Sequence, residues 1–237
     1  MKIIILPYYK MGIIKMHAII MYMMFSIMTM LSLLRASLSH PGRVPQYVGS
    51  MDQADWQYCD KCSHKRPPRS HHCSRCGHCV TMMDHHCPWI NNCVGQDNRF
   101  AFLQLIFYTM GLSVSALAFC GSKSYKLPPC PEEYCPSDSW FVEHEHGLLV
   151  ASYVMSTLMA VGITALSCGQ HFSVALDVTT IESMIAKNPL DLYMSRPERP
   201  MKYRYDELCG TKNVLLWLWP CRSRLQNKQL LYDPHIV

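Results

Sequence analysis

Cysteine and histidine are concentrated in one short stretch of the sequence. Between residues 59 and 93 lie seven of the chain's thirteen cysteines and six of its twelve histidines. Thiolate sulfur and imidazole nitrogen are ligands that zinc prefers. The spacings Cys59-x2-Cys62 and Cys73-x2-Cys76-x2-Cys79 are the short turns that such tetrahedral sites favour. We therefore expect this stretch to bind metal.

The number of cysteines suggests a second role. Because each tetrahedral site takes four ligands, two sites with three cysteines and one histidine each would leave one of the seven cysteines without metal. A spare thiol becomes an effective nucleophile when a neighbouring base or positive charge favours the thiolate. The spacing alone does not identify that residue. It also leaves open that all seven cysteines are structural, or that one zinc is bound and the other thiols are buried.

The composition places this stretch in a membrane protein with soluble insertions. With 49% hydrophobic and 16% charged residues and a mean hydropathy of +0.01, the chain is too apolar for an ordinary cytosolic domain. Residues 18–34, 100–120 and 147–175 contain no Asp, Glu, Lys or Arg, and they predict three membrane-spanning helices. A signal peptide is the alternative for residues 1–34, but no small-residue cleavage site follows the apolar run.

The charges of the connecting segments predict the orientation. Lys and Arg outnumber acids between residues 35 and 99 and in the tail from residue 177, whereas residues 121–146 hold five acids and two lysines. The positive-inside rule then places the first two segments in the cytosol and residues 121–146 in the lumen or outside the cell. The stub before the first helix becomes lumenal, against its own three lysines. The net charge of +5 reflects this orientation, so we expect no nucleic-acid partner.

These observations predict an all-α integral membrane protein, with transmembrane helices and a cytosolic zinc-bound cysteine-rich loop domain. Cys130 and Cys135 fall in its lumenal loop, where either a disulfide or two free thiols would be compatible with the compartment. Cys221 is either a lipidated cysteine or part of an interfacial anchor. The expected segments are a lumenal stub and first transmembrane helix (1–35), the cysteine-rich domain (36–99), a transmembrane helix (100–120), the lumenal loop (121–146), a transmembrane helix (147–170) and a cytosolic C-terminal region (171–237).

The residues that follow the array support a family resemblance. Asp84, His85, His86 and Cys87, followed by Pro-Trp-Ile-Asn-Asn-Cys-Val-Gly, resemble the cysteine-rich domain of the DHHC family of protein S-acyltransferases, the palmitoyltransferases. The likeness covers residues 56–105 almost continuously. Weaker matches are a His-Pro-Gly at residues 40–42 in place of the family's Asp-Pro-Gly, a Thr-Thr-x-Glu at residues 179–182, and a C-terminal membrane-hugging element at residues 210–219, where Cys209 replaces an aromatic residue.

The resemblance implies how the ligands divide between two zinc ions. The spare thiol is then Cys87. Because the two sets interleave along the chain, neither half of the loop should fold without the other. The implied first set is Cys59, Cys62, His72 and Cys79, and the implied second set is Cys73, Cys76, His86 and Cys93.

The resemblance also implies the chemistry. His85 would act as the base for Cys87, and Asp84 would hold the other imidazole nitrogen. The implied activity is that of a protein S-palmitoyltransferase. It moves a long-chain fatty acyl group, palmitate above all, from acyl-CoA through an acyl-enzyme on Cys87 to cysteines of membrane-associated substrate proteins. The expected cofactors are two structural Zn²⁺ ions, with fatty acyl-CoA as co-substrate.

A membrane setting suits this reaction. Exposing an acyl chain to water costs about 0.8 kcal/mol per methylene, so the bilayer is an expected partner of the enzyme. We expect an integral protein of the endoplasmic reticulum, the Golgi or the plasma membrane, with the active site facing the cytosol. Phe102, Leu105, Tyr108, Thr109 and Gly111 are candidates to line an acyl cavity, although apolar stripes more often face lipid or other helices.

Two alternatives come from other classes of protein. The family usually has four transmembrane helices, and this chain begins about where the first would join the second. That departure suggests a catalytically inactive, zinc-bound membrane adaptor as the alternative. A ubiquitin ligase of the RING type also interleaves its zinc ligands. A RING domain, however, has no use for Asp84 and His85 beside a free cysteine.

Overall fold

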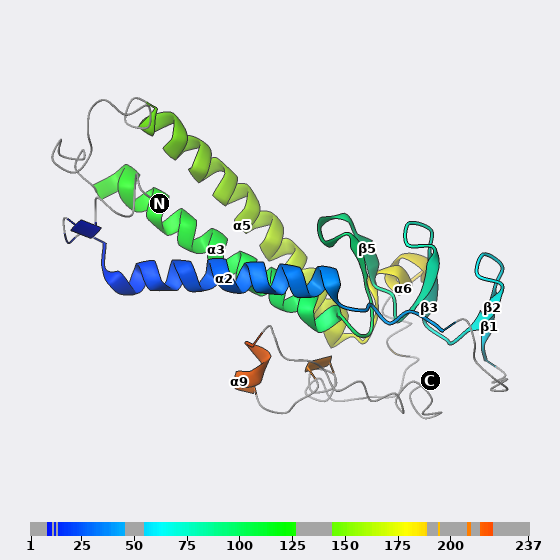
Figure 1. Cartoon of the computed structure of the whole chain (residues 1–237). Coiled ribbons are helices and arrows are strands. Elements are labelled where there is room, and N and C mark those ends of the chain that lie inside the picture. Colours follow the sequence, from blue (N-terminus) through cyan, green and yellow to red (C-terminus); the bar gives the residue numbers. More distant parts are fainter. Residues whose placement is uncertain are drawn as a thin grey trace. The chain divides into compact units, whose positions relative to one another are not determined.

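The computed structural model describes residues 9–10, 12, 14–45, 55–126, 144–188, 194, 208–209 and 214–219 (Figure 1). The expectations for Cys130, Cys135, Cys221 and residues 210–213 lie outside these ranges. The described residues divide into two compact units. One draws on Met1–Met30 and Ile106–Cys168, and the other on Leu31–Leu105 and Gly169–Val237.

Long apolar helices form where the charge-free runs predict them. The helices are α2 (Met16–Leu38), α3 (Arg99–Lys126) and α5 (Glu145–Ala175). Among the described residues, these three are long and apolar enough to cross a membrane. At a rise of 1.5 Å per residue, the 23 residues of α2 span about 35 Å. The helices extend past the apolar runs because flanking polar side chains can reach the membrane surface.

In the first unit, α2 and α3 pack through aromatic rings. Tyr22 of α2 meets Phe119 of α3 edge to face, with ring centroids 5.8 Å apart. The ring of Phe25 lies against Gly111, where an added Cβ would come to 2.5 Å from Phe25 Cε1. The glycine therefore permits a close approach of the two helices. A larger residue at position 111 would have to displace the ring.

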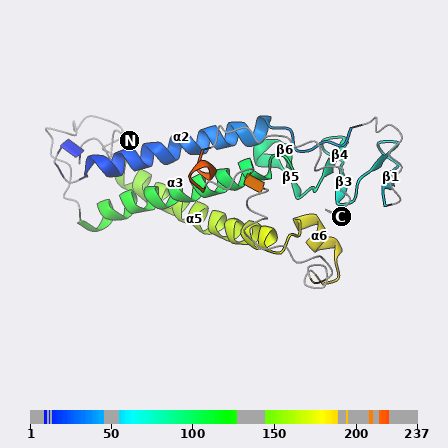
Figure 2. The same ribbon diagram turned by 90° about the horizontal axis from the view of Figure 1, so that it is seen from below.

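The expected all-α class is only partly right, because the cysteine-rich region folds as three antiparallel hairpins (Figure 2). Each strand has three or four residues, too few for an alternating apolar pattern to be visible in the sequence. The turns of the ligand-bearing segments bring the strands together. The pairs are β1 (Gln57–Cys59) with β2 (His64–Arg66), β3 (Ser70–Cys73) with β4 (His78–Thr81), and β5 (His85–Cys87) with β6 (Asn92–Val94).

Cysteines make up much of the core of these hairpins. One buried cluster consists of Cys73, Val80, Met83 and Cys93, and a second of Val44, Cys59 and Cys79. Few large apolar side chains take part. A domain with so little apolar core needs another source of stability, and bound metal is the usual one in small domains.

Short helices follow the long ones in the described part of the chain. α6 (Thr180–Ile185) begins a few residues after α5 ends (Figure 2), and α9 (Val214–Trp217) lies near the C-terminus. The side chain of Gln104 on α3 donates a hydrogen bond of 2.7 Å to the carbonyl oxygen of Trp217. α9 is thereby tied to the same unit as the hairpins.

Gly95 lies where β6 leaves the sheet and passes close to Pro41 and Val80. A Cβ at this position would overlap the Pro41 carbonyl oxygen and come to 2.5 Å from Val80 Cγ1. We expect Gly95→Ala to lower the free energy of unfolding by about 2 kcal/mol or more, since backbone atoms must move. Thermal unfolding in detergent checks this, with Gly169→Ala, which meets no atom within 4 Å, as the control. Equal midpoints for the two variants would contradict it.

Candidate active site

The structure brings the eight expected ligands together in two groups. In each group, one ligand atom per residue lies within 4.8 Å of all the others. Cys59, Cys62, His72 and Cys79 form the first cluster, and Cys73, Cys76, His86 and Cys93 form the second. Among the described residues, no other cysteine belongs to either cluster.

The distances within the first cluster suit a tetrahedral metal. The Nδ1 atom of His72 lies 3.7 Å from Cys59 Sγ and 3.1 Å from Cys62 Sγ. Cys62 Sγ and Cys79 Sγ are 3.7 Å apart. With Zn–S bonds of about 2.3 Å and Zn–N bonds of about 2.0 Å, a tetrahedral site has ligand-to-ligand distances of roughly 3.5–3.8 Å. Two of the three distances lie in this range, and the distance between His72 and Cys62 is shorter. The sulfur atoms are too far apart for a disulfide, which joins them at about 2 Å.

The second cluster has the same dimensions. His86 Nδ1 lies 3.6 Å from Cys73 Sγ, 3.3 Å from Cys76 Sγ and 3.7 Å from Cys93 Sγ. Cys76 Sγ and Cys93 Sγ are 3.5 Å apart. Three thiols and one imidazole in this arrangement are a donor set that fits zinc.

The hairpins explain why the ligands interleave. Successive side chains of a strand point to opposite faces, so the neighbours His72 and Cys73 on β3 turn to different clusters. The pairing of β3 with β4 sets His72 opposite Cys79. The pairing of β5 with β6 likewise sets His86 opposite Cys93. Each of these two hairpins therefore places two residues of one cluster side by side.

The same alternation separates Cys87 from the metal ligands. On β5, His86 turns to the second cluster, whereas His85 and Cys87 share the other face of the strand. Cys87 is 5% exposed and belongs to neither cluster. It is followed by Pro88, which begins the short 3-10 helix η1 (Pro88–Ile90). The strand thus presents one ligand on one face, and a histidine with a free thiol on the other.

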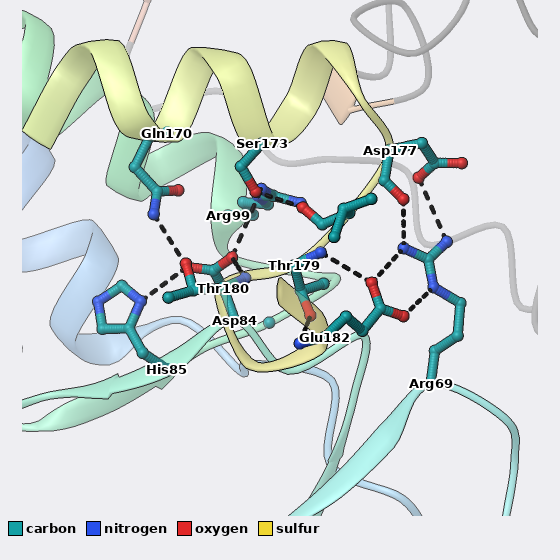
Figure 3. A network of polar contacts seen from close by, with 12 residues as sticks. Arg69, Asp84, His85, Arg99, Gln170, Ser173, Asp177, Thr179, Thr180 and Glu182 are labelled. Carbon is teal, nitrogen blue, oxygen red and sulfur yellow. Dashed lines mark hydrogen bonds and ion pairs between the residues drawn. The ribbon is translucent and has the colours of Figure 1, made fainter. Parts of the chain in front are cut away.

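Asp84 lies at the centre of a buried polar network (Figure 3). The side chain is 0% exposed, and its Oδ2 atom lies 2.8 Å from His85 Nδ1. Two other donors reach the same oxygen, Gln170 Nε2 and Thr180 Oγ1, each at 2.9 Å. The backbone N–H of Thr180 donates to Oδ1 at 2.9 Å, and Arg99 Nη2 lies 3.5 Å from that oxygen. The carboxylate is held from α3, α5 and α6 at once.

This network fixes the charge of the carboxyl group. Burial by itself would raise the pKa of Asp84, but the hydrogen bond with His85, the charge of Arg99 and the donors Thr180 and Gln170 hold that pKa well below its usual range. Asp84 therefore stays ionised. It orients His85 by accepting the Nδ1 hydrogen.

His85 and Cys87 each shift the pKa of the other toward its charged form. Burial lowers the pKa of His85, but Asp84 and Cys87 outweigh it and raise that pKa to about 9. Burial raises the pKa of the Cys87 thiol, whereas the interaction with His85 and the backbone N–H groups of Ile90 and Trp89 lower it overall. An imidazolium beside a thiolate is the arrangement of an activated cysteine nucleophile.

The structure also shows residues of the site that the sequence reasoning missed. Gln170 on α5 is 4% exposed and Arg99 at the start of α3 is 6% exposed, and both contact Asp84. An amide inside an apolar helix is costly without a partner, so Gln170 carried a signal that was available in the sequence. The ring of Phe102, one of the candidate cavity residues, lies edge to face with His85 at a centroid distance of 5.2 Å.

Comparisons with known proteins show the family to which this chain belongs. The family model described as DHHC palmitoyltransferase matches residues 52–187. Palmitoyltransferase ZDHHC21 of Mus musculus is 42% identical over 225 residues, which cover 94% of this chain and 83% of the relative. The proteins of the same name from Homo sapiens and Danio rerio are each 41% identical with the same coverage.

Proposed function

Because this chain belongs to the DHHC palmitoyltransferase family and is a protein S-palmitoyltransferase, we propose that Cys87 is the residue that carries the acyl group. The observation that supports this assignment most strongly is that neighbouring side chains of β5 lie on opposite faces of the strand. His86 lies in a metal cluster, whereas Cys87 lies on the other face beside His85 and outside both clusters. A free thiol with an oriented histidine is what acyl transfer needs.

The proposed reaction has two steps with balanced bonds. The Cys87 thiolate attacks the carbonyl carbon of fatty acyl-CoA, the carbon–sulfur bond to coenzyme A breaks, and the departing thiolate takes a proton from the His85 imidazolium. The thiol of a substrate protein then gives its proton to His85 and attacks the acyl-enzyme, which releases Cys87. One thioester replaces another at each step, so no ATP is required.

Asp84 and the metal clusters have supporting roles in this proposal. Asp84 keeps the His85 ring in place and stabilises its positive charge. We assign one zinc ion to Cys59, Cys62, His72 and Cys79 and a second to Cys73, Cys76, His86 and Cys93. When bound, the zinc ions supply cross-links and positive charge near the site.

We propose that the reaction takes place at the cytosolic surface of the membrane. The segment of residues 36–99 would face the cytosol and residues 121–146 the lumen, as the positive-inside rule predicts. α3 begins at Arg99, shortly after the nucleophile, so Cys87 would lie near the end of a membrane helix. Trp89 is 90% exposed and is suited to anchor the site in the interface.

Substrates follow from the same chemistry. We propose that the enzyme uses palmitoyl-CoA or a similar long-chain acyl-CoA and acts on cysteines of proteins at the membrane surface, in the endoplasmic reticulum, the Golgi or the plasma membrane. The comparisons lend no support to the catalytically inactive adaptor. They also favour the acyltransferase over the ubiquitin ligase.

Incubation of the detergent-purified protein with radiolabelled palmitoyl-CoA tests the proposed acyl-enzyme. We expect a protein-bound label that hydroxylamine at neutral pH removes, because thioesters are cleaved under these conditions, and that moves to an added cysteine-containing acceptor. Prior removal of zinc with a chelator should prevent labelling, since the clusters hold the hairpins. Label that resists hydroxylamine, or that never leaves the enzyme, would contradict the proposal.

A further inference from the structure

A second, partly buried polar group adjoins the Asp84 network without contacting Asp84 directly (Figure 3). Arg69, in the turn before β3, forms two hydrogen bonds with the Glu182 carboxylate, Nε to Oε1 at 2.7 Å and Nη2 to Oε2 at 3.1 Å. It also reaches Asp177, with Nη1 3.2 Å from Oδ1 and Nη2 2.9 Å from the carbonyl oxygen. The three side chains are 18%, 10% and 17% exposed. We call this group the Arg69 clamp.

The clamp holds the start of α6. The Oε2 atom of Glu182 also accepts the backbone N–H of Thr179 at 2.7 Å, and Thr179 Oγ1 accepts the backbone N–H of Glu182 at 3.2 Å. This is a capping box, in which the two residues satisfy each other's N–H groups. One carboxylate therefore binds Arg69 and caps the helix at the same time.

The capped end of α6 is the part that touches the site. Thr180, next to the capping residue, donates both its backbone N–H and its hydroxyl to Asp84 at 2.9 Å. A connected path thus runs from Arg69 to Glu182 and from Glu182 to Thr179. The next residue, Thr180, bonds to Asp84, which bonds to His85. Arg69 itself contacts neither His85 nor Cys87 in any of these interactions.

α6 is held by one apolar contact and by polar contacts at its first turn. It has six residues, none of them fully buried; Ile181 packs against the buried cluster of the hairpins, whereas Met184 and Ile185 are largely exposed. A helix of this length is unstable alone, so its position depends on these two kinds of contact together. The backbone conformation also indicates that contacts hold this region in place. Arg69 and Asp177 adopt left-handed φ angles of 61° and 53°. Residues other than glycine rarely take this conformation unless surrounding contacts impose it.

We propose that Arg69 is a positioning residue for acyl transfer, which fixes Thr180 on Asp84 and thereby orients His85. This inference rests on the proposed roles of Asp84, His85 and Cys87. Without the clamp, α6 would lose its polar anchor and Asp84 two of its donors. Gln170 and Arg99 alone would then position the carboxylate against His85, and His85 would spend less time aligned with Cys87. The step that slows is the chemistry, not the binding of acyl-CoA.

The main test is Arg69→Met, assayed by the rate of acyl-enzyme formation with palmitoyl-CoA. We expect the rate at saturating palmitoyl-CoA to fall roughly 10- to 100-fold, with KM unchanged within about twofold. Arg69→Lys should be intermediate, because lysine keeps the charge but not the paired hydrogen bonds. Lys65→Met, which removes an exposed positive charge from β2, is the matched control and should behave as the parent does.

A double variant of Arg69 and Thr180 distinguishes the positioning role of Arg69 from other roles. Thr180→Val should slow the chemistry, and Arg69→Met should add little to it in the double variant, since both act on Asp84 in series. A double variant whose loss of rate equals the product of the two single losses would overturn the proposal. A rise in KM alone in the Arg69→Met variant would also overturn it. A KM effect would mean that the guanidinium binds the anionic co-substrate. If the Arg69→Met variant binds less zinc than the parent, its rate no longer isolates the positioning role. The rate of the Arg69→Lys variant, measured at full zinc content, then tests the proposal in its place.

The outcome for Arg69 is distinguishable from the outcome for the proposed function. Equal rates for Arg69→Met and Lys65→Met, together with an inactive Cys87→Ser variant, would remove only the positioning role. A Cys87→Ser variant that still forms the thioester would overturn the proposed function itself.

Discussion

Replacement of Cys87 by serine is expected to abolish both acyl-enzyme formation and transfer to an acceptor. A serine hydroxyl beside His85 is a far weaker nucleophile than the thiolate that the site stabilises, so we expect a loss of roughly a thousandfold or more. The protein should still bind two metal ions, because Cys87 belongs to neither cluster. Labelling with radioactive palmitoyl-CoA and elemental analysis of the same sample measure the two quantities.

A matched control for this variant is Cys168→Ser. Cys168 is an exposed cysteine of α5 and lies outside both clusters, so its loss should leave labelling and metal content unchanged. A Cys87→Ser protein with about one metal ion, beside a parent with two, would show that the ligands are wrongly divided.

The two neighbouring histidines of β5 should respond in opposite ways to replacement by alanine. His86→Ala removes one of the four proposed ligands of the second metal ion, so we expect loss of that ion and unfolding of the hairpins. His85→Ala removes the proposed base from the other face of the strand. It should keep both metal ions and slow acyl-enzyme formation by about 100- to 10,000-fold.

Metal content, protease sensitivity and labelling rate together measure this contrast. His86→Ala should be cleaved readily within residues 55–98, and His85→Ala should be as resistant as the parent. His64→Ala, in β2 and outside both clusters, is the histidine control. Equal loss of metal from the His85 and His86 variants would contradict the separation of ligand and base.

The three long apolar helices and the stretch that holds the Cys/His clusters could be predicted from the sequence because their signals are local. A charge-free apolar run of about twenty residues specifies a helix by its length alone. Repeated Cys-x2-Cys turns specify metal ligands by their chemistry. Which ligands belong together is not local. Cys79 follows Cys76 by three residues yet joins the first cluster, since β4 sets it opposite His72 on β3.

The hairpins and the residues that bond to Asp84 could not be predicted from the sequence, and the reasons are physical. Strands of three or four residues are too short to show an alternating pattern, and the cysteine-rich stretch therefore looked like a loop in an all-α protein. Gln170 is separated from Asp84 by 86 residues, and Thr180 by 96. Such contacts depend on how the end of α5 from Gly169 onward and α6 lie against Asp84, and no local rule encodes that arrangement.

The proposal that Cys87 carries the acyl group is tested most directly by locating that group on the enzyme. The protein is incubated with palmitoyl-CoA without an acceptor, digested at acidic pH and analysed by mass spectrometry. We predict a palmitoyl group on Cys87 that hydroxylamine removes and that disappears when an acceptor cysteine is added. An acyl group on another cysteine, such as Cys168 or Cys209, with Cys87 unmodified throughout the reaction, would contradict the account.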